Sequence, residues 1–163
     1  MDNLKFQDFK MLVFKVGREE YGIQISNVVS IERMNSISIY PNMPPHVLGV
    51  TSIRNIVMPV VDLRSALTGK LLPPTETTRL ILVNVREREI GLVVDTATEV
   101  LDIAPDMIQH PNLLETKDVT FLQGISKIGD RLLILLDIEE LLQDTTNLDA
   151  LKDMIDSFKN EES

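Results

Sequence analysis

The chain has 163 residues, of which 44% are hydrophobic, so it is long enough for one domain with a substantial core. Its 25 acidic and 16 basic residues give a formal net charge of −9, which argues against nucleic-acid binding and direct membrane insertion and favours protein partners. The chain has no cysteine and no run of roughly 20 apolar residues, so we expect a cytoplasmic protein without disulfides, thiolate metal sites or membrane spans.

The first elements are those of a β-hairpin. Two strand-like runs, 11–16 and 20–25, flank a short turn in which Gly17 can supply unusual backbone angles. Residues 26–32 predict a short helix with Ser26 as its N-cap. The segment 36–46 carries three prolines and therefore predicts an extended connection.

A second pair of strands follows at 47–54 and 56–61. The second of them contains Pro59, which has no N–H for a strand ladder and so predicts an edge or a bulge. Asp62 stands where a carboxylate can cap the start of a helical turn, and Gly69 stands where that turn can end. These elements together make up the first of two similar copies in the chain.

The same order recurs in the second half of the chain. Residues 11–34 align without a gap with 80–103, and residues 48–67 align with 123–142. We therefore expect two pseudo-repeats, 11–67 and 80–142, joined by a Pro/Thr linker at 70–78. Two copies of a hairpin-rich unit predict a mainly β fold of two similar barrels or sandwiches, with a few short helices.

An amphipathic segment ends the chain. Residues 147–163 predict a C-terminal helix followed by a polar tail, because apolar side chains recur there at helical spacing: Leu148, Leu151, Met154, Ile155 and Phe158. We expect this helix to dock on the body of the protein.

No catalytic or metal-binding motif is present. The paired Asp62 and Asp137 could act as an acid and a base, but each stands at a strand-to-helix junction of its own copy, where capping explains it. His46 and His110 lie in proline-containing loops without a second imidazole at ligand spacing. We expect no catalytic residue, no metal and no cofactor, and an enzyme using Asp62 and Asp137 is the least favoured interpretation.

Arg54 differs between the copies. It follows an apolar strand, occupies a turn with Asn55, and is replaced by Gly129 in the second copy. A solvated loop arginine is the simplest interpretation, but a planar guanidinium also suits recognition at an interface. The difference between the copies favours a binding role.

The run LGVTSIRNIVMPVVDLR resembles the signature of the CheW-like family of bacterial chemotaxis coupling proteins, and the similarity covers about residues 10–143. The resemblance implies two five-stranded SH3-like β-barrels around a shared core. In this family the halves can be interleaved in space, so the two pseudo-repeats need not coincide with the two barrels.

The resemblance also implies a function. Members are non-catalytic adaptors that couple the cytoplasmic tips of methyl-accepting chemoreceptors to the CheW-like regulatory domain of the histidine kinase CheA, at membrane-associated receptor arrays. It implies receptor-binding residues at Arg54, Val28, Ser30 and Val100 and assigns no kinase-contact residue. The alternative is a CheW-like scaffold for a different chemosensory pathway, controlling surface motility or gene expression.

Two positions depart from the family signature. Asn55 replaces a glycine, and because asparagine tolerates the left-handed backbone we expect the turn to survive. Ser30 stands where the family often has a glutamate, which removes an ion-pair partner for Arg54. Glu32 is the nearest carboxylate that can replace it.

Overall fold

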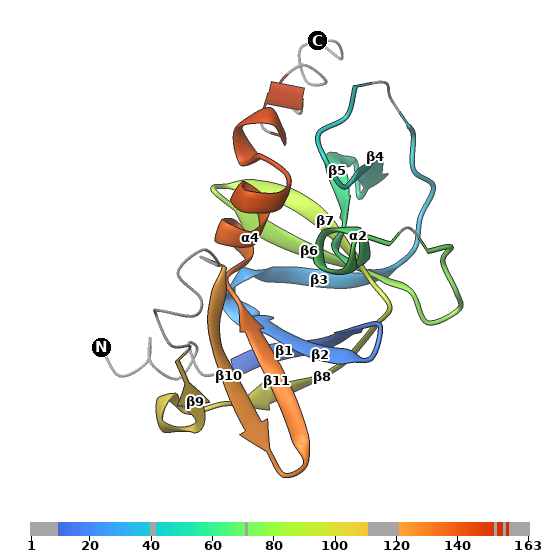
Figure 1. Cartoon of the computed structure of the whole chain (residues 1–163). Helices are drawn as coiled ribbons and strands as arrows, with labels where there is room; N and C mark the ends of the chain where they lie inside the picture. Colours follow the sequence, from blue (N-terminus) through green and yellow to red (C-terminus); the bar gives the residue numbers. More distant parts are fainter. Residues whose placement is uncertain are drawn as a thin grey trace.

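The computed structural model describes residues 10–39, 42–70, 72–110, 121–151, 153, 154 and 156. This part of the chain is mainly β and forms two sheets, which lie one above the other in Figure 1. The first sheet has the order β8-β1-β2-β11-β10-β9, with β1 Lys10–Val16, β2 Glu19–Gln24, β8 Thr96–Asp102, β9 Ile108–Gln109, β10 Leu122–Ile128 and β11 Arg131–Leu136. The second sheet has the order β3-β6-β7-β5-β4, with β3 Val28–Arg33, β4 Val47–Ile53, β5 Ile56–Asp62, β6 Arg79–Val85 and β7 Arg88–Val94.

The two sheets form the expected pair of small SH3-like barrels, and each contains strands from both pseudo-repeats. The first sheet takes the hairpin β1–β2 from the first copy and β8, β9, β10 and β11 from the second. The second sheet takes β3, β4 and β5 from the first copy and the hairpin β6–β7 from the second. Each barrel is therefore closed by a hairpin that the other half of the chain supplies.

Parallel pairs of strands join the two copies at equivalent places. In the first sheet β2 runs parallel to β11, and Gly22 is the partner of Leu135. In the second sheet β7 runs parallel to β5, and Gly91 is the partner of Val60. In the alignment of the copies Gly22 matches Gly91 and Val60 matches Leu135, so the two pairs of residues are equivalent. The duplication therefore extends to the register of the strands.

A core shared by both barrels explains why β1 and β6 are nearly continuous apolar runs. Successive side chains of a strand point to opposite faces, and in these strands both faces are buried. Leu12 and Phe14 of β1 join Ile81 and Val83 of β6 in the shared core. The alternate residues fill the interior of each barrel, with Met11 and Val13 in the first and Leu80 and Leu82 in the second.

The predicted hairpins are confirmed, whereas the helix predicted at 26–32 is wrong. Residues Ile25–Asn27 form a single 3₁₀ turn that begins after Gln24, so Ser26 is not its N-cap. The strand β3 follows immediately, with alternating half-buried and exposed residues, and pairs antiparallel with β6. Pairing with a strand more than 45 residues away in the sequence outweighs the weak local helical signal.

The edge or bulge predicted for Pro59 is also wrong, because the bulge of the β4–β5 ladder falls between Val47 and Gly49. The strand β5 lies inside the second sheet, between β7 and β4, and Pro59 is the partner of Val50. The ladder between β5 and β7 begins only at Val60, one residue later, so the missing N–H of the proline interrupts no pairing with β7.

The predicted helix caps are confirmed. The helix α2 spans Leu63–Thr68, its N-cap Asp62 accepts a hydrogen bond from Arg64 N, and Gly69 ends it in the left-handed conformation. The helix α4 spans Ile138–Thr145, and its N-cap Asp137 accepts from Glu140 N at 3.2 Å.

The C-terminal segment packs on the body of the protein. Residues 148–151, 153, 154 and 156 are helical. Leu148 and Leu151 are buried in the shared core, and Met154 packs against it. The predicted stripe positions Ile155 and Phe158 lie outside the described residues.

Candidate functional site

The turn between β4 and β5 presents Arg54 to solvent. Arg54 and Asn55 both have positive φ, 52° and 66°, which is the geometry of a tight two-residue hairpin turn. Asparagine thus holds the left-handed conformation expected at position 55. The Arg54 side chain is 64% exposed, so most of its guanidinium is available to a partner.

Glu32 replaces the missing family glutamate as the partner of Arg54. Arg54 Nη2 donates to Glu32 Oε2 at 2.9 Å, and this ion pair ties the β4–β5 turn to the end of β3. Ser30, another of the predicted receptor-binding residues, lies on the same side of β3 as Glu32. Its hydroxyl is buried and has no hydrogen-bond partner among the described residues.

The structure places the other two candidate residues on different sheets. Val28 begins β3, is the partner of Val83 in β6, and packs partly against the shared core. Val100 lies on β8 of the first sheet, is the partner of Leu12, and is 48% exposed. The strands β3 and β8 are both edge strands, each of a different sheet.

The sequence interpretation missed two exposed apolar residues of β3, Val29 and Ile31. Ile31 on β3 is 44% exposed and aligns with Val100 when the copies are superposed. The duplication was the signal that could have found it, because both residues occupy the same place on equivalent edge strands.

Asp62 and Asp137 have structural partners. Each carboxylate accepts a backbone N–H at the start of its helix. Asp62 is also buried, 1% exposed, and its two oxygens accept from Arg64 Nε at 3.0 Å and Arg64 Nη2 at 3.1 Å. These contacts account for both residues without an acid–base role.

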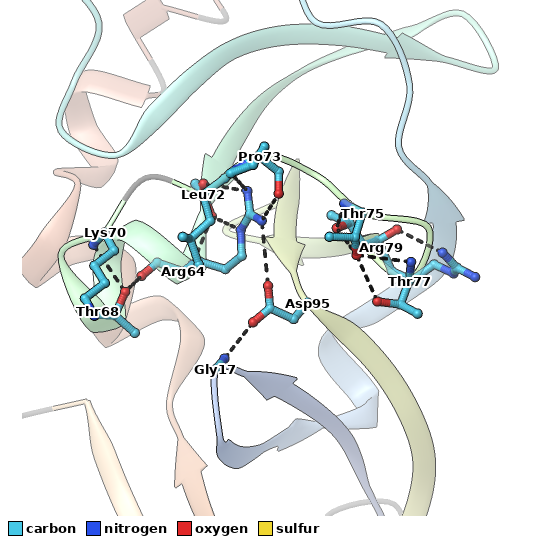
Figure 2. A network of polar contacts seen from close by, with 12 residues as sticks. Gly17, Arg64, Thr68, Lys70, Leu72, Pro73, Thr75, Thr77, Arg79 and Asp95 are labelled. Carbon is cyan, nitrogen blue, oxygen red and sulfur yellow. Dashed lines mark hydrogen bonds and ion pairs between the residues drawn. The ribbon is translucent and has the colours of Figure 1, made fainter.

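Arg64 joins the two barrels through a buried polar network (Figure 2). The sequence interpretation did not single out this residue. Its side chain is 3% exposed and donates to the carbonyl oxygens of Leu72 and Pro73 in the linker between the copies. Its Nη1 lies 3.6 Å from Asp95, and the second oxygen of Asp95 accepts from Gly17 N in the turn between β1 and β2.

The Arg64 network therefore connects the first sheet, the second sheet and the linker. Burial on its own would lower the pKa of Arg64, but the hydrogen bonds and charge of Asp62 raise it overall, so the guanidinium stays charged. The sequence signal was present, because Arg64 aligns with Glu139 in the second copy and so differs between copies as Arg54 does.

A second arginine joins three strands of the first sheet. Arg131 on β11 donates from Nε and Nη2 to the two oxygens of Glu20 on β2, at 3.1 and 2.9 Å, and also donates to Glu99 on β8. The forked bond from Arg131 holds the pKa of Glu20 below its ordinary value of 4.5.

This ion pair predicts an acid-sensitive part of the stability. A carboxyl whose folded-state pKa is depressed contributes stability that is present above its unfolded pKa and is lost as the pH falls through the folded value. We expect Glu20→Gln to lower the denaturant midpoint at about pH 7 and to have a much smaller effect at about pH 3.5. Glu19→Gln, at an exposed neighbouring position, is the control, and an equal effect of Glu20→Gln at both pH values would contradict the prediction.

No group of acidic or histidine side chains in the described part of the chain could hold a metal ion. Within the same residues, no helix is long and apolar enough to cross a membrane.

The fold and the site define a β-rich interaction module, in which two interlocked barrels present an exposed arginine turn beside an edge strand with exposed apolar residues. The model of the CheW-like domain matches residues 10–146, which include all the strands described above. The chain belongs to the CheW-like family.

Curated relatives and a solved structure agree with this assignment. The chain is 35% identical over 134 residues to the chemotaxis protein CheW of Klebsiella aerogenes, covering 82% of this chain and 81% of that protein. It is 32% identical over 145 residues to the chemotaxis protein CheW of Bacillus subtilis, covering 88% and 93%. The crystal structure of the scaffolding protein TtCheW from Thermoanaerobacter tengcongensis superposes with a TM-score of 0.75 at 29% identity, covering 83% of this chain and 93% of that one.

Proposed function

We propose that this protein is a non-catalytic chemotaxis adaptor that couples the cytoplasmic tips of chemoreceptors to the regulatory domain of a CheA-type histidine kinase. The observation that carries the proposal is the CheW-like match over residues 10–146, which spans both barrels. The protein acts in the cytoplasm and is recruited to membrane-associated receptor arrays. There, multivalent contacts strengthen individually modest interfaces.

An adaptor needs separate faces on one rigid body, and the architecture suits this requirement. The shared core and the buried Arg64 network hold the two barrels together. A receptor tip is a helical hairpin, which can dock in a groove between apolar edge strands. The receptor face comprises Arg54 at the end of the second sheet, Val28 and Ser30 on β3, and Val100 on β8.

Arg54 is the residue of this face that gives the sharpest test. One of its N–H groups is directed to Glu32, and the rest of the exposed guanidinium is free to form forked hydrogen bonds to a partner. We expect Arg54→Ala to weaken binding of a receptor-tip fragment about tenfold and to leave binding of the CheA regulatory domain unchanged. Because the Arg54–Glu32 pair is exposed, its loss should cost at most about 1 kcal/mol of stability.

Isothermal titration calorimetry with each partner measures both interactions. Arg18→Ala, which removes an exposed arginine from the β1–β2 turn, is the control for loss of one positive charge. Glu32→Gln removes the internal partner but keeps Arg54, so it separates the guanidinium from the ion pair. If the parent protein binds neither partner, the chain serves a different chemosensory pathway, and a large fall in melting temperature for Arg54→Ala would show instead that the arginine is structural.

A further inference from the structure

Two arginines lie side by side at one end of the second sheet. Arg33 is the last residue of β3 and Arg79 is the first residue of β6, and they are direct partners in the antiparallel register. Partners of this kind project their side chains from the same face of a sheet, only a few ångströms apart. Two like charges at such positions destabilise the sheet unless a counter-charge lies between them.

Neither arginine has a carboxylate partner among the described residues. Five of the chain's eight arginines form ion pairs with described residues. Arg33 and Arg79 form none within the described part of the chain, although acidic residues outnumber basic ones by 25 to 16. An arginine couple that forms no ion pair with the described residues is a place where an external anion can bind.

The surroundings hold Arg79 in a fixed orientation. Its Nη1 donates to the carbonyl oxygens of Glu76 and Thr78 at 2.8 and 2.9 Å. These two bonds leave the N–H groups of Nε and Nη2 for another acceptor. Figure 2 shows the side chain beside Thr75 and Thr77, whose hydroxyls lie 3.1 Å apart.

A shallow surface hollow opens at this place. It is lined by Arg33, Arg79, Thr75, Thr78, Glu76 and Met34. The two guanidiniums and the carboxylate of Glu76 give the hollow a net charge of about +1, which matches one carboxylate better than a phosphate dianion. Met34 adds an apolar residue to the lining.

We propose that the Arg33–Arg79 pair is a binding site for a carboxylate side chain in an acidic segment of a partner protein. A guanidinium matches a carboxylate through two parallel N–H···O bonds, and Arg79 is already oriented for such a fork. The site lies at the end of the second sheet that contains the last residue of β3 and the first residue of β6.

The test follows the arginine Nε–H signals by NMR while the full-length protein is titrated with an acetylated, amidated tetraglutamate peptide. We expect saturable shifts of the Arg33 and Arg79 signals with a dissociation constant of about 1–10 mM, because a solvent-exposed site for one carboxylate binds weakly. The Arg18 signal is the internal control, since this exposed arginine also lacks an ion pair among the described residues. Equal, non-saturable shifts at all three arginines would overturn the site.

Three variants and a second ligand sharpen the result. Arg33→Gln, at a position without an internal hydrogen bond among those described, should abolish the saturable shift of Arg79. Arg79→Lys keeps the charge but removes the fork and should weaken binding several-fold. Glu76→Gln raises the net charge of the hollow and should tighten binding about threefold to fivefold. Tighter binding of inorganic phosphate than of the peptide would overturn the assignment to a carboxylate.

Discussion

Replacement of Arg64 by methionine is expected to lower the free energy of unfolding by about 3–5 kcal/mol, because the change leaves buried charges and carbonyl groups without their donor. The carboxylate of Asp62 is 1% exposed and would keep only the backbone N–H at the helix start. The carbonyl oxygens of Leu72 and Pro73 would also lose the guanidinium. Methionine replaces the aliphatic part of the arginine side chain, so the loss reports mainly the polar contacts of the guanidinium.

The duplication supplies a matched control for this measurement. Arg86 stands at the turn equivalent to Gly17 and pairs with Glu139, the residue that aligns with Arg64, at 3.4 Å. That pair is about half exposed, so Arg86→Met should cost at most about 1 kcal/mol. Urea denaturation of both variants measures the difference, and a cost for Arg64→Met no larger than that for Arg86→Met would refute the role of Arg64 in joining the barrels.

Gly49→Ala is expected to destabilise the protein by about 2–4 kcal/mol, because a methyl group at this position meets backbone atoms. Gly49 lies at a bulge in β4, next to Val50, which forms an antiparallel bridge with Ser38. A Cβ there would stand 2.1 Å from Ser38 O, and the glycine has a φ of +156°. The bulge and the segment at Ser38 cannot move apart without breaking the two backbone hydrogen bonds between Ser38 and Val50.

Two other glycines calibrate the effect of Gly49→Ala. Gly124 occupies the equivalent bulge in the second copy, where a Cβ would stand 2.5 Å from the Cγ2 methyl of Ile108 and 3.1 Å from Gln109 O, so its nearest backbone atom is farther away than at Gly49. Gly17 has a φ of +63° and open space around it, so Gly17→Ala should cost only about 1 kcal/mol of backbone strain. The predicted order of melting temperatures is Gly17→Ala above Gly124→Ala above Gly49→Ala, and thermal denaturation that gave equal values would contradict the steric argument.

The parts of the fold that could be predicted are those that local sequence decides. The hairpin turn at Gly17 and the cap at Asp62 each depend on a few neighbouring residues, and both are present as expected. The strand β3 was predicted as a helix, because its pairing with β6 depends on a segment far along the chain. The exchange of hairpins between the copies depends on long-range packing, and no short stretch of sequence encodes it.

In the candidate site, too, some features could be predicted from the sequence and others depended on long-range packing. The difference between Arg54 and Gly129 in the two copies identified an exposed arginine turn, and the duplication also contained the signals for Ile31 and Arg64. The pairing of Arg54 with Glu32 depended on the direction in which β3 presents its side chains. That direction follows from the strand register, which alternates half-buried and exposed residues from Val28 to Arg33.

The crossed hairpins make the protein equivalent to a strand-swapped dimer whose two subunits have been fused by the linker at 70–78. In such a molecule neither half contains a complete barrel, so neither can fold as an independent unit. A substitution that unravels one half removes strands from both barrels at once. The interaction faces on the two barrels therefore form and unfold together. A half-folded adaptor that binds one partner without the other does not accumulate.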